Sequence, residues 1–339
     1  MDFLPSIPPT AQAAAIGVEN LYRAGALEVH NLPKISLENE IHKLFERCAF
    51  PNLTDAMYEQ LRPVLLLASM FLSHPVCSDW WVRLCLASQL EDQENGISYL
   101  SEINITDEMR ALTVKLLRYV STYIFFYLDD EPERTHGNTY FFKRKESLAE
   151  LLGVESDDDD EPEFFYAKIR LNRQFSEWLQ YEVDVSPLGL RYRTYFCMAV
   201  TLVHELAHAV HGIRFRLLSI DEFDRFCFNI TDPETEIGLA WENDTFGSLP
   251  LVSTSDDETE DWTAIPYWGV FSWKWNARRG SDSAVAYPVP TAWVAKLFTK
   301  EFWEHTVEEL RTEIQLPRSG LGTVENEQGE WLAIQNEVE

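Results

Sequence analysis

The segment from Thr201 to Val210 holds the residue types best suited to chemistry in this chain. It reads TLVHELAHAV and places His204 and His208 four residues apart. Side chains at positions i and i+4 of a helix share one face, so both imidazoles can reach a single metal ion. Glu205 lies beside them, and a carboxylate in that position can take a proton from metal-bound water. The pattern therefore predicts a zinc ion (Zn²⁺) held by two histidines, with Glu205 as general base.

The neighbours of these residues indicate that the helix is buried. All are uncharged, so the predicted helix is apolar on nearly all sides. They are Thr201, Leu202, Leu206, Ala207, Ala209 and Val210. The alternative is a surface helix with two structural histidines and a glutamate. Ionisable groups in such an apolar run are costly to bury unless something compensates them, which favours the metal site.

The segment resembles the motif of the zincin metallopeptidases, which prefers Thr or Val three places before the first histidine and uncharged neighbours throughout. Thr201 and the flanking residues fit this motif. The resemblance implies that His204 and His208 are zinc ligands and that Glu205 is the general base. The segment is also similar to HELAH segments of fungal proteins, a likeness that implies no substrate.

The third ligand separates the zincin subclasses. Metzincins require a glycine and then a histidine at the positions where this chain has His211 and Arg214. No GTxxD segment supports an aspartate ligand. A gluzincin-type arrangement remains, in which a glutamate from a later helix completes the site.

Residues 231–247, TDPETEIGLAWENDTFG, predict that later helix. Asp232 can cap it, and Pro233 suits its first turn. Glu234 and Glu236 would complement the positive end of the helix dipole.

Glu242 lies deeper in this predicted helix and is the favoured third ligand. Its helical neighbours are Leu239, Gly238 and Phe246, so its carboxylate projects from an apolar face, where it needs a cation. Glu236 is the alternative ligand, and its simpler role is compensation of the helix dipole.

Several other residues are candidates for supporting roles. The segment 231–247 is similar to the glutamate helix of thermolysin-like enzymes. Gluzincins often have an aspartate that orients a histidine four residues after the ligand, where this chain has Phe246, so Asp244 or another carboxylate is the candidate for that role. His211, one turn beyond His208, either contacts substrate or is structural. Candidate oxyanion donors are Tyr192, Tyr195, Tyr267 and Tyr287, whose alternative role is packing.

Composition and charge limit the function classes. The chain has 339 residues, of which 45% are hydrophobic, enough for one large core or two modest ones. The net charge of -28 repels phosphate backbones and anionic lipids, so we expect neither nucleic acid nor membrane as a partner. The oligomeric state is not predicted.

Compartment is predicted from the N-terminus and the cysteines. Prolines and charges interrupt Met1 to Gly25, so no signal peptide is expected. The longest apolar windows, Leu65–Leu72 and Ala199–Val210, are too short or too polar to cross a bilayer. Five cysteines without a CxxC pair indicate reduced core residues in a cytoplasmic protein.

The predicted fold class is α+β and mainly helical, a zincin-like core with a small mixed sheet. The predicted regions are a helical N-terminal region (1–130), an acidic loop region (131–163), a zincin-like metal-binding region (164–316) and a flexible tail (317–339). The predicted helices are 58–74, 80–90, 109–128 with Asp107 as cap, 188–215, 233–245 and 291–314.

Three further segments complete the prediction. Alternation over 164–172 predicts a strand, which is either an edge that receives an extended substrate or an ordinary structural strand. The run ESDDDDEPE (155–163) predicts an exposed loop. The aromatic-rich stretch 261–290 predicts loops or short strands near the mouth of the site.

The leading functional hypothesis is hydrolysis of an amide or peptide bond by metal-activated water. A zinc enzyme that acts on a small molecule in a biosynthetic pathway is the second. A non-catalytic interaction protein stabilised by zinc is the third, and it is disfavoured because a structural zinc is usually closed by four protein ligands.

Overall fold

The computed structural model consists of two compact units, each assembled from segments that are distant along the chain. Unit 1 contains Met1–Leu37, Glu182–Cys197 and Thr245–Glu339, and unit 2 contains Glu38–Tyr181 and Met198–Asp244. The four regions predicted from the sequence are contiguous ranges instead. The structure describes residues 19, 21–28, 30–128, 135–145, 163–216, 226–232, 235–251, 264–267, 269–274, 285–317, 321–325 and 331–335.

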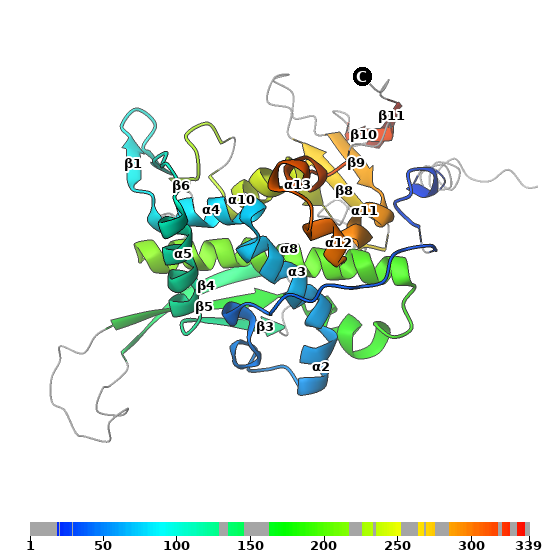
Figure 1. Ribbon diagram of the computed structural model, residues 1–339, viewed down its shortest axis with the longest axis horizontal. Helices are drawn as coiled ribbons and strands as arrows, with labels where there is room; N and C mark the ends of the chain where they lie inside the picture. Colours follow the sequence, from blue (N-terminus) through cyan, green and yellow to red (C-terminus); the bar gives the residue numbers. More distant parts are fainter. Residues whose placement is uncertain are drawn as a thin grey trace, which may run out of the picture. The chain divides into compact units, whose positions relative to one another are not determined.

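The fold is α+β and mainly helical with small mixed sheets, as predicted (Figure 1). The helices are α2 (Asp55–Gln60), α3 (Arg62–Ser73), α4 (Pro75–Leu86), α5 (Asp107–Val120), α7 (Arg173–Glu177), α8 (Leu188–Phe215), α10 (Ile237–Phe246), α11 (Thr291–Lys296), α12 (Lys300–Trp303) and α13 (Val307–Glu313). Shorter turns are η1 (Lys43–Phe45), η2 (Arg47–Ala49) and η3 (Trp178–Glu182).

The strands form three sheets. They are β1 (Gln89–Asp92), β2 (Ile97–Leu100), β3 (Ile124–Leu128), β4 (Gly137–Lys145), β5 (Glu163–Leu171), β6 (Phe226–Cys227), β7 (Leu249–Leu251), β8 (Val270–Lys274), β9 (Val285–Val289), β10 (Leu321–Glu325) and β11 (Trp331–Gln335). Unit 2 holds the sheets β1-β2-β6 and β3-β5-β4, and unit 1 holds the sheet β11-β10-β9-β8-β7.

The strand predicted over 164–172 is β5, the central strand of its sheet. It pairs in parallel with β3 and antiparallel with β4. Both sides of β5 are therefore paired, so of the two predicted alternatives β5 is the ordinary structural strand and not the edge that receives a substrate. Among the described strands β4 is an edge of this sheet.

Strand β4 lies against the central helix α8 within unit 2 (Figure 1). The Thr139 hydroxyl donates to Glu205 of α8, and the ring of Phe141, two residues along the strand, lies over Gly212. Side chains two apart on a strand share one face, so Thr139 and Phe141 both point at the helix. The register of β4 thus sets which strand residue meets Glu205.

Helix α8 is the longest described helix and is confirmed over its predicted span. Its apolar side chains, such as Leu202 and Leu206, are fully buried. It is long and apolar enough to cross a membrane by length and composition alone, but 83% of its most apolar window is buried in the structure. Such burial is also what the core helix of a folded domain shows.

The predicted helices of the first half differ in their limits. Residues 58–74 contain two helices that meet at Leu61, and α5 ends at Val120 rather than continuing to Leu128. The residues beyond it form β3, because their alternating burial suits pairing with β5. Thr106, whose hydroxyl accepts from the Met109 amide, is the N-cap in place of Asp107.

Unit 1 combines its antiparallel sheet with three short helices. The single helix predicted over 291–314 is divided into α11, α12 and α13. The aromatic-rich stretch 261–290 contains β8 and β9, and the predicted tail contains β10 and β11. The acidic run at 155–163 lies outside the described residues except for its last position.

All five cysteines are free thiols. Cys77, Cys197 and Cys227 are buried as predicted for core residues. Cys48 is exposed, so the prediction of a core position is wrong there.

We predict that Gly212→Ala destabilises the protein, because the added methyl group would overlap the ring of Phe141. Overpacking of this kind costs about 1–3 kcal/mol. Replacement of a helical glycine by alanine otherwise stabilises by about 1 kcal/mol. Thermal unfolding should show a lower midpoint for Gly212→Ala, and Phe141→Leu in the same chain should restore part of it. A higher midpoint for the single variant would show that β4 does not pack on α8 in this way.

Candidate metal centre

His204 and His208 lie one turn apart on α8, with ring centroids 5.3 Å from one another. The helix forms because the surrounding residues are apolar and pack on both sides of it. The two imidazoles are the accessible part of this stretch, since their side chains are 19% and 21% exposed. An otherwise buried stretch of the helix thus leaves two imidazole rings partly accessible.

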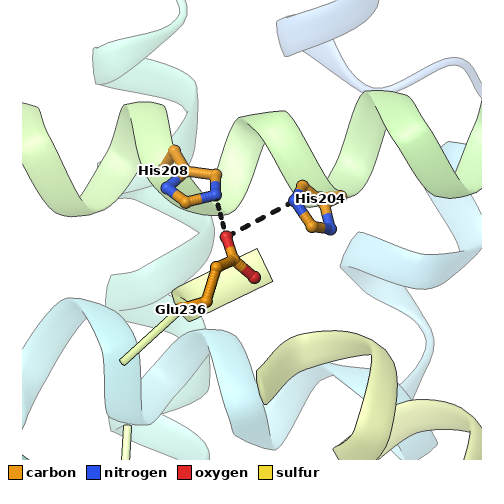
Figure 2. A group of neighbouring side chains, drawn as sticks. All are labelled: His204, His208 and Glu236. Atoms are coloured by element: carbon orange, nitrogen blue, oxygen red, sulfur yellow. Dashed lines mark ion pairs between the residues drawn. The ribbon is translucent and has the colours of Figure 1, made fainter. Parts of the chain in front are cut away.

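Glu236 lies opposite the two histidines (Figure 2). Its Oε1 is 3.4 Å from Nε2 of His204 and contacts Nε2 of His208. The candidate ligand atoms of these three side chains lie within 4.8 Å of one another, so the group could hold a metal ion. Ligand atoms about 2.1 Å from one tetrahedrally coordinated ion are roughly 3.4 Å apart, which matches the His204–Glu236 distance.

Glu236 is held by the start of α10. Its carboxylate accepts from the amide of Gly238 at 3.2 Å and from the amide of Leu239. Helix α10 begins at Ile237, four residues later than predicted, so Glu236 occupies the capping position. Asp232, predicted to cap, instead accepts from the Asn229 amide at 2.7 Å. The predicted roles of Pro233 and Glu234 lie outside the described residues.

Glu242 binds the other nitrogen of the first histidine. Its Oε1 is 2.7 Å from Nδ1 of His204, and its side chain is buried. A carboxylate on one ring nitrogen fixes the ring orientation and directs the second nitrogen toward a metal. The structure therefore groups the alternative ligand Glu236 with both histidines and places the favoured ligand Glu242 behind His204.

Gly238 allows this arrangement because α10 approaches α8 closely. A Cβ atom at Gly238 would lie 2.5 Å from ring atoms of His204, closer than side chains tolerate. Trp241, further along α10, packs edge-on against Phe71 of α3 with centroids 5.7 Å apart. The helix is thus fixed on one side by packing while its glycine faces the histidine.

The electrostatics of the group are dominated by opposite charges at short range. Burial would lower the pKa of His204, but Glu236 and Glu242 hold it well above its ordinary value. Burial would raise the pKa of Glu236, but the two histidines hold it well below the usual range. Burial raises the pKa of Glu242. A cation in contact with these side chains would replace the proton on His204 as the balancing charge.

Glu205 lies on the neighbouring face of α8 and is nearly buried, with 6% exposure. Its Oε2 accepts from the Thr139 hydroxyl at 2.7 Å, and the same hydroxyl is 3.0 Å from its backbone carbonyl. Since Thr139 occupies one carboxylate oxygen, the side chain has a fixed orientation. Glu205, which follows His204 in the chain, therefore has a defined conformation.

The sequence analysis missed the contribution of β4. Residues 136–142 read HGNTYFF and were included in the predicted acidic loop region. The signal was present, because the β-branched Thr139 and the aromatic residues that follow it are types enriched in strands. His136, at the start of this strand, has its pKa lowered to about 4 by burial, and the nearby His204 acts in the same direction.

The remaining candidates have other surroundings. His211 packs against Phe215 and Phe226, with centroids 5.1 and 3.9 Å away, and burial lowers its pKa to about 3. These contacts favour a structural role. Asp244 is exposed on α10, and Glu242 takes the position on His204 for which Asp244 was a candidate.

The candidate tyrosines belong to unit 1, whereas the metal centre belongs to unit 2. Tyr192 donates to the carbonyl of Pro33, and the exposed Tyr267 donates to Glu182 at 3.0 Å. Tyr195 is buried near Phe298. The hydroxyl groups of Tyr192 and Tyr267 are thus satisfied, as in tyrosines with a packing role.

Comparison of the chain with protein-family models, curated proteins and solved structures gave no match.

We predict that Glu236→Ala weakens metal binding more than Glu242→Ala does. Loss of a residue that orients a ligand typically costs about 10–100-fold in metal affinity, and loss of a ligand should exceed that. Competition with a chromophoric chelator measures both dissociation constants for Zn²⁺. Glu236→Asp serves as a control, because it keeps the carboxylate but shortens its reach. The reverse order of affinities would identify Glu242 as the ligand.

Proposed function

We propose that this protein is a zinc-dependent hydrolase of the zincin type that cleaves an amide or peptide bond. The observation that carries the proposal is the meeting of His204, His208 and Glu236, with Glu205 next to them on α8. Two imidazoles and one carboxylate are a ligand set of catalytic zinc sites, in which a fourth position stays open to water. A zincin-like core is part of the same proposal.

Zinc bound to these three side chains would polarise a carbonyl group and lower the pKa of the water that it binds. Glu205 would accept the proton of that water and later deliver it to the leaving nitrogen. The bond from Thr139 supports this role, because it holds one oxygen of the carboxylate and leaves the other for proton transfer. Glu242 would keep Nε2 of His204 directed at the ion.

The position of β4 favours an extended substrate. This strand pairs with β5 on one side, and no described strand pairs with its other side. Thr139 of β4 lies in contact with Glu205. An extended peptide can add to an open strand edge through main-chain hydrogen bonds. A peptide bound there would run beside the proposed general base, which supports a peptide over a compact small molecule.

The number of ligands supports catalysis over a structural metal. Structural zinc sites usually have four protein ligands, whereas the group here has three among the described residues. Glu205 would also have no function in a purely structural site. The small-molecule enzyme and the non-catalytic protein remain as outcomes of the experiments below.

We predict that Glu205→Gln retains stoichiometric zinc but loses hydrolytic activity. The amide preserves the size of the side chain but accepts no proton, and general base catalysis contributes about 10²–10⁴-fold in rate. Zinc content is measured by elemental analysis of protein purified without chelators, and activity with casein and a peptide library. Full activity of the variant would refute the mechanism.

Two controls separate the alternatives. His208→Ala should lose zinc and activity together, while Asp244→Asn, which alters an exposed side chain on α10, should change neither. A wild-type protein that holds zinc but cleaves no peptide would favour the small-molecule enzyme. A wild-type protein without zinc would overturn the proposed function altogether.

A further inference from the structure

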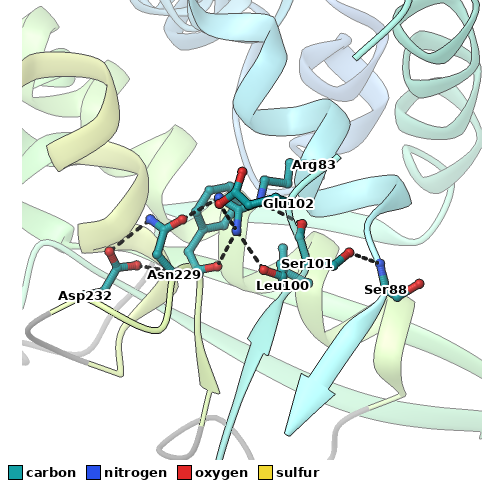
Figure 3. Close-up of polar contacts among 8 residues, drawn as sticks. Arg83, Ser88, Leu100, Ser101, Glu102, Asn229 and Asp232 are labelled. Atoms are coloured by element: carbon teal, nitrogen blue, oxygen red, sulfur yellow. Dashed lines mark hydrogen bonds and ion pairs between the residues drawn. The ribbon is translucent and has the colours of Figure 1, made fainter. Parts of the chain in front are cut away.

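Arg83, in the last turn of α4, connects three segments of unit 2 (Figure 3). Its guanidinium donates to the carbonyl of Leu100, the last residue of β2, at 2.7 Å and to that of the next residue, Ser101, at 3.1 Å. It also donates to the side-chain oxygen of Asn229, just after β6, and is 3.1 Å from the carboxylate of Glu102. A single side chain thus binds α4 to the ends of two neighbouring strands.

The side chain of Arg83 is largely shielded from water. Its side chain is 12% exposed, and the guanidinium carbon lies 4.6 Å from the centre of the Phe228 ring. That ring is itself stacked on Trp80 of α4, with centroids 4.7 Å apart. Hydrogen bonds from a charged group in such surroundings are stronger than those of an exposed arginine.

The Asn229 side chain links Arg83 to the tight turn between Asn229 and Asp232. Its amide nitrogen Nδ2 donates to Asp232 at 3.0 Å, and its backbone amide donates to the same carboxylate at 2.7 Å. The Asp232 amide in return donates to the Asn229 carbonyl at 3.0 Å. Strand β6 has two residues and pairs with β2 alone among the described strands, so the bond from Arg83 to Asn229 and the bond from the Leu100 amide to the Phe228 carbonyl fix where the turn begins.

Glu236 follows this turn by four residues. Four residues span at most about 14 Å, so the position of Asp232 limits where Glu236 can lie. On its other side Glu236 is fixed by the start of α10, where its carboxylate accepts the Gly238 amide. The glutamate opposite the histidines is therefore held between two anchors, of which Arg83 provides the first.

We infer that Arg83 is a positioning residue for the candidate metal centre, acting through Asn229 on the segment that carries Glu236. This inference rests on the proposed function, because it assumes that Glu236 binds the metal. Arg83 contacts none of the histidines itself in the described hydrogen bonds and ion pairs. Its effect is to fix the position of Asn229, where the segment that leads to Glu236 begins.

Arg47 provides a matched control in the same unit. It donates to the carbonyl of Phe50 at 2.7 Å and of Leu53 at 2.5 Å, and to the carboxylate of Asp55 at 2.9 Å. Its guanidinium carbon lies 5.8 Å from the centre of the Tyr58 ring. Arg47 thus makes the same kinds of contact as Arg83, but to segments that carry none of the candidate ligands.

The experiment compares Arg83→Lys, Asn229→Ala and Arg47→Lys in the full chain. Lysine keeps the positive charge but has no fork to bind several carbonyls at once. Asn229→Ala leaves Arg83 bound to β2 and removes its link to the turn, together with the bond from Nδ2 of Asn229 to Asp232. Zn²⁺ dissociation constants are measured by chelator competition, and thermal unfolding of the metal-free proteins reports stability.

We expect the zinc dissociation constant to rise about tenfold in Arg83→Lys and by a similar or smaller factor in Asn229→Ala, as for other residues that support metal ligands. Arg47→Lys should lower the unfolding midpoint without changing the dissociation constant. In a Glu236→Ala background, Arg83→Lys should no longer weaken binding, because the ligand that it positions is gone.

The possible results separate this inference from the proposed function. Equal zinc affinity in Arg83→Lys, Asn229→Ala and the wild type would overturn the positioning role and leave the metal site intact. An equal loss of affinity in Arg47→Lys would show a general effect of stability and would also overturn it. A wild-type chain that binds no zinc would instead refute the proposed function.

Discussion

The structure of unit 2 depends on how the charged and polar groups of α8 are compensated inside an apolar environment. His204 lies between two carboxylates, one on each ring nitrogen, and Glu205 accepts from Thr139. A buried ionisable group without such a partner costs several kcal/mol, at about 1–3 kcal/mol for each unmet hydrogen bond and more for a charge. The helix can therefore be central only because β4 on one side and α10 on the other bring these partners to it.

Sequence analysis identified the parts that depend on local periodicity. The span of α8 and the pairing of His204 with His208 follow from residues four apart in an apolar helix, and β5 follows from alternation over nine residues. These signals are strong because several residues in each segment follow the same periodicity. The α+β class follows from the same patterns, since both periodicities occur in the chain.

Features that depend on where a helix or strand ends, or on contacts between residues far apart in the chain, could not be predicted from the sequence. Whether Glu236 or Glu242 faces both histidines depends on where α10 begins, and helix ends are the least certain part of any pattern. Thr139 lies in a segment that was predicted to be a loop because of its charges. Its partner Glu205 is 66 residues away along the chain. Arg83 gave no signal, because two of its partners are backbone carbonyls, which look alike in every sequence, and its partner Asn229 is 146 residues away along the chain.

The carboxylate of Glu236 contacts both the histidines and the start of α10, so it affects the helix as well as the histidines. The same carboxylate that faces them also closes the first turn of α10 by accepting two amide hydrogens. Fraying of that turn would release the carboxylate, and withdrawal of the carboxylate would leave the turn unsatisfied. Initiation of the helix and assembly of the His204, His208 and Glu236 group are thus a single cooperative event, so the group and the first turn of α10 form or dissolve together.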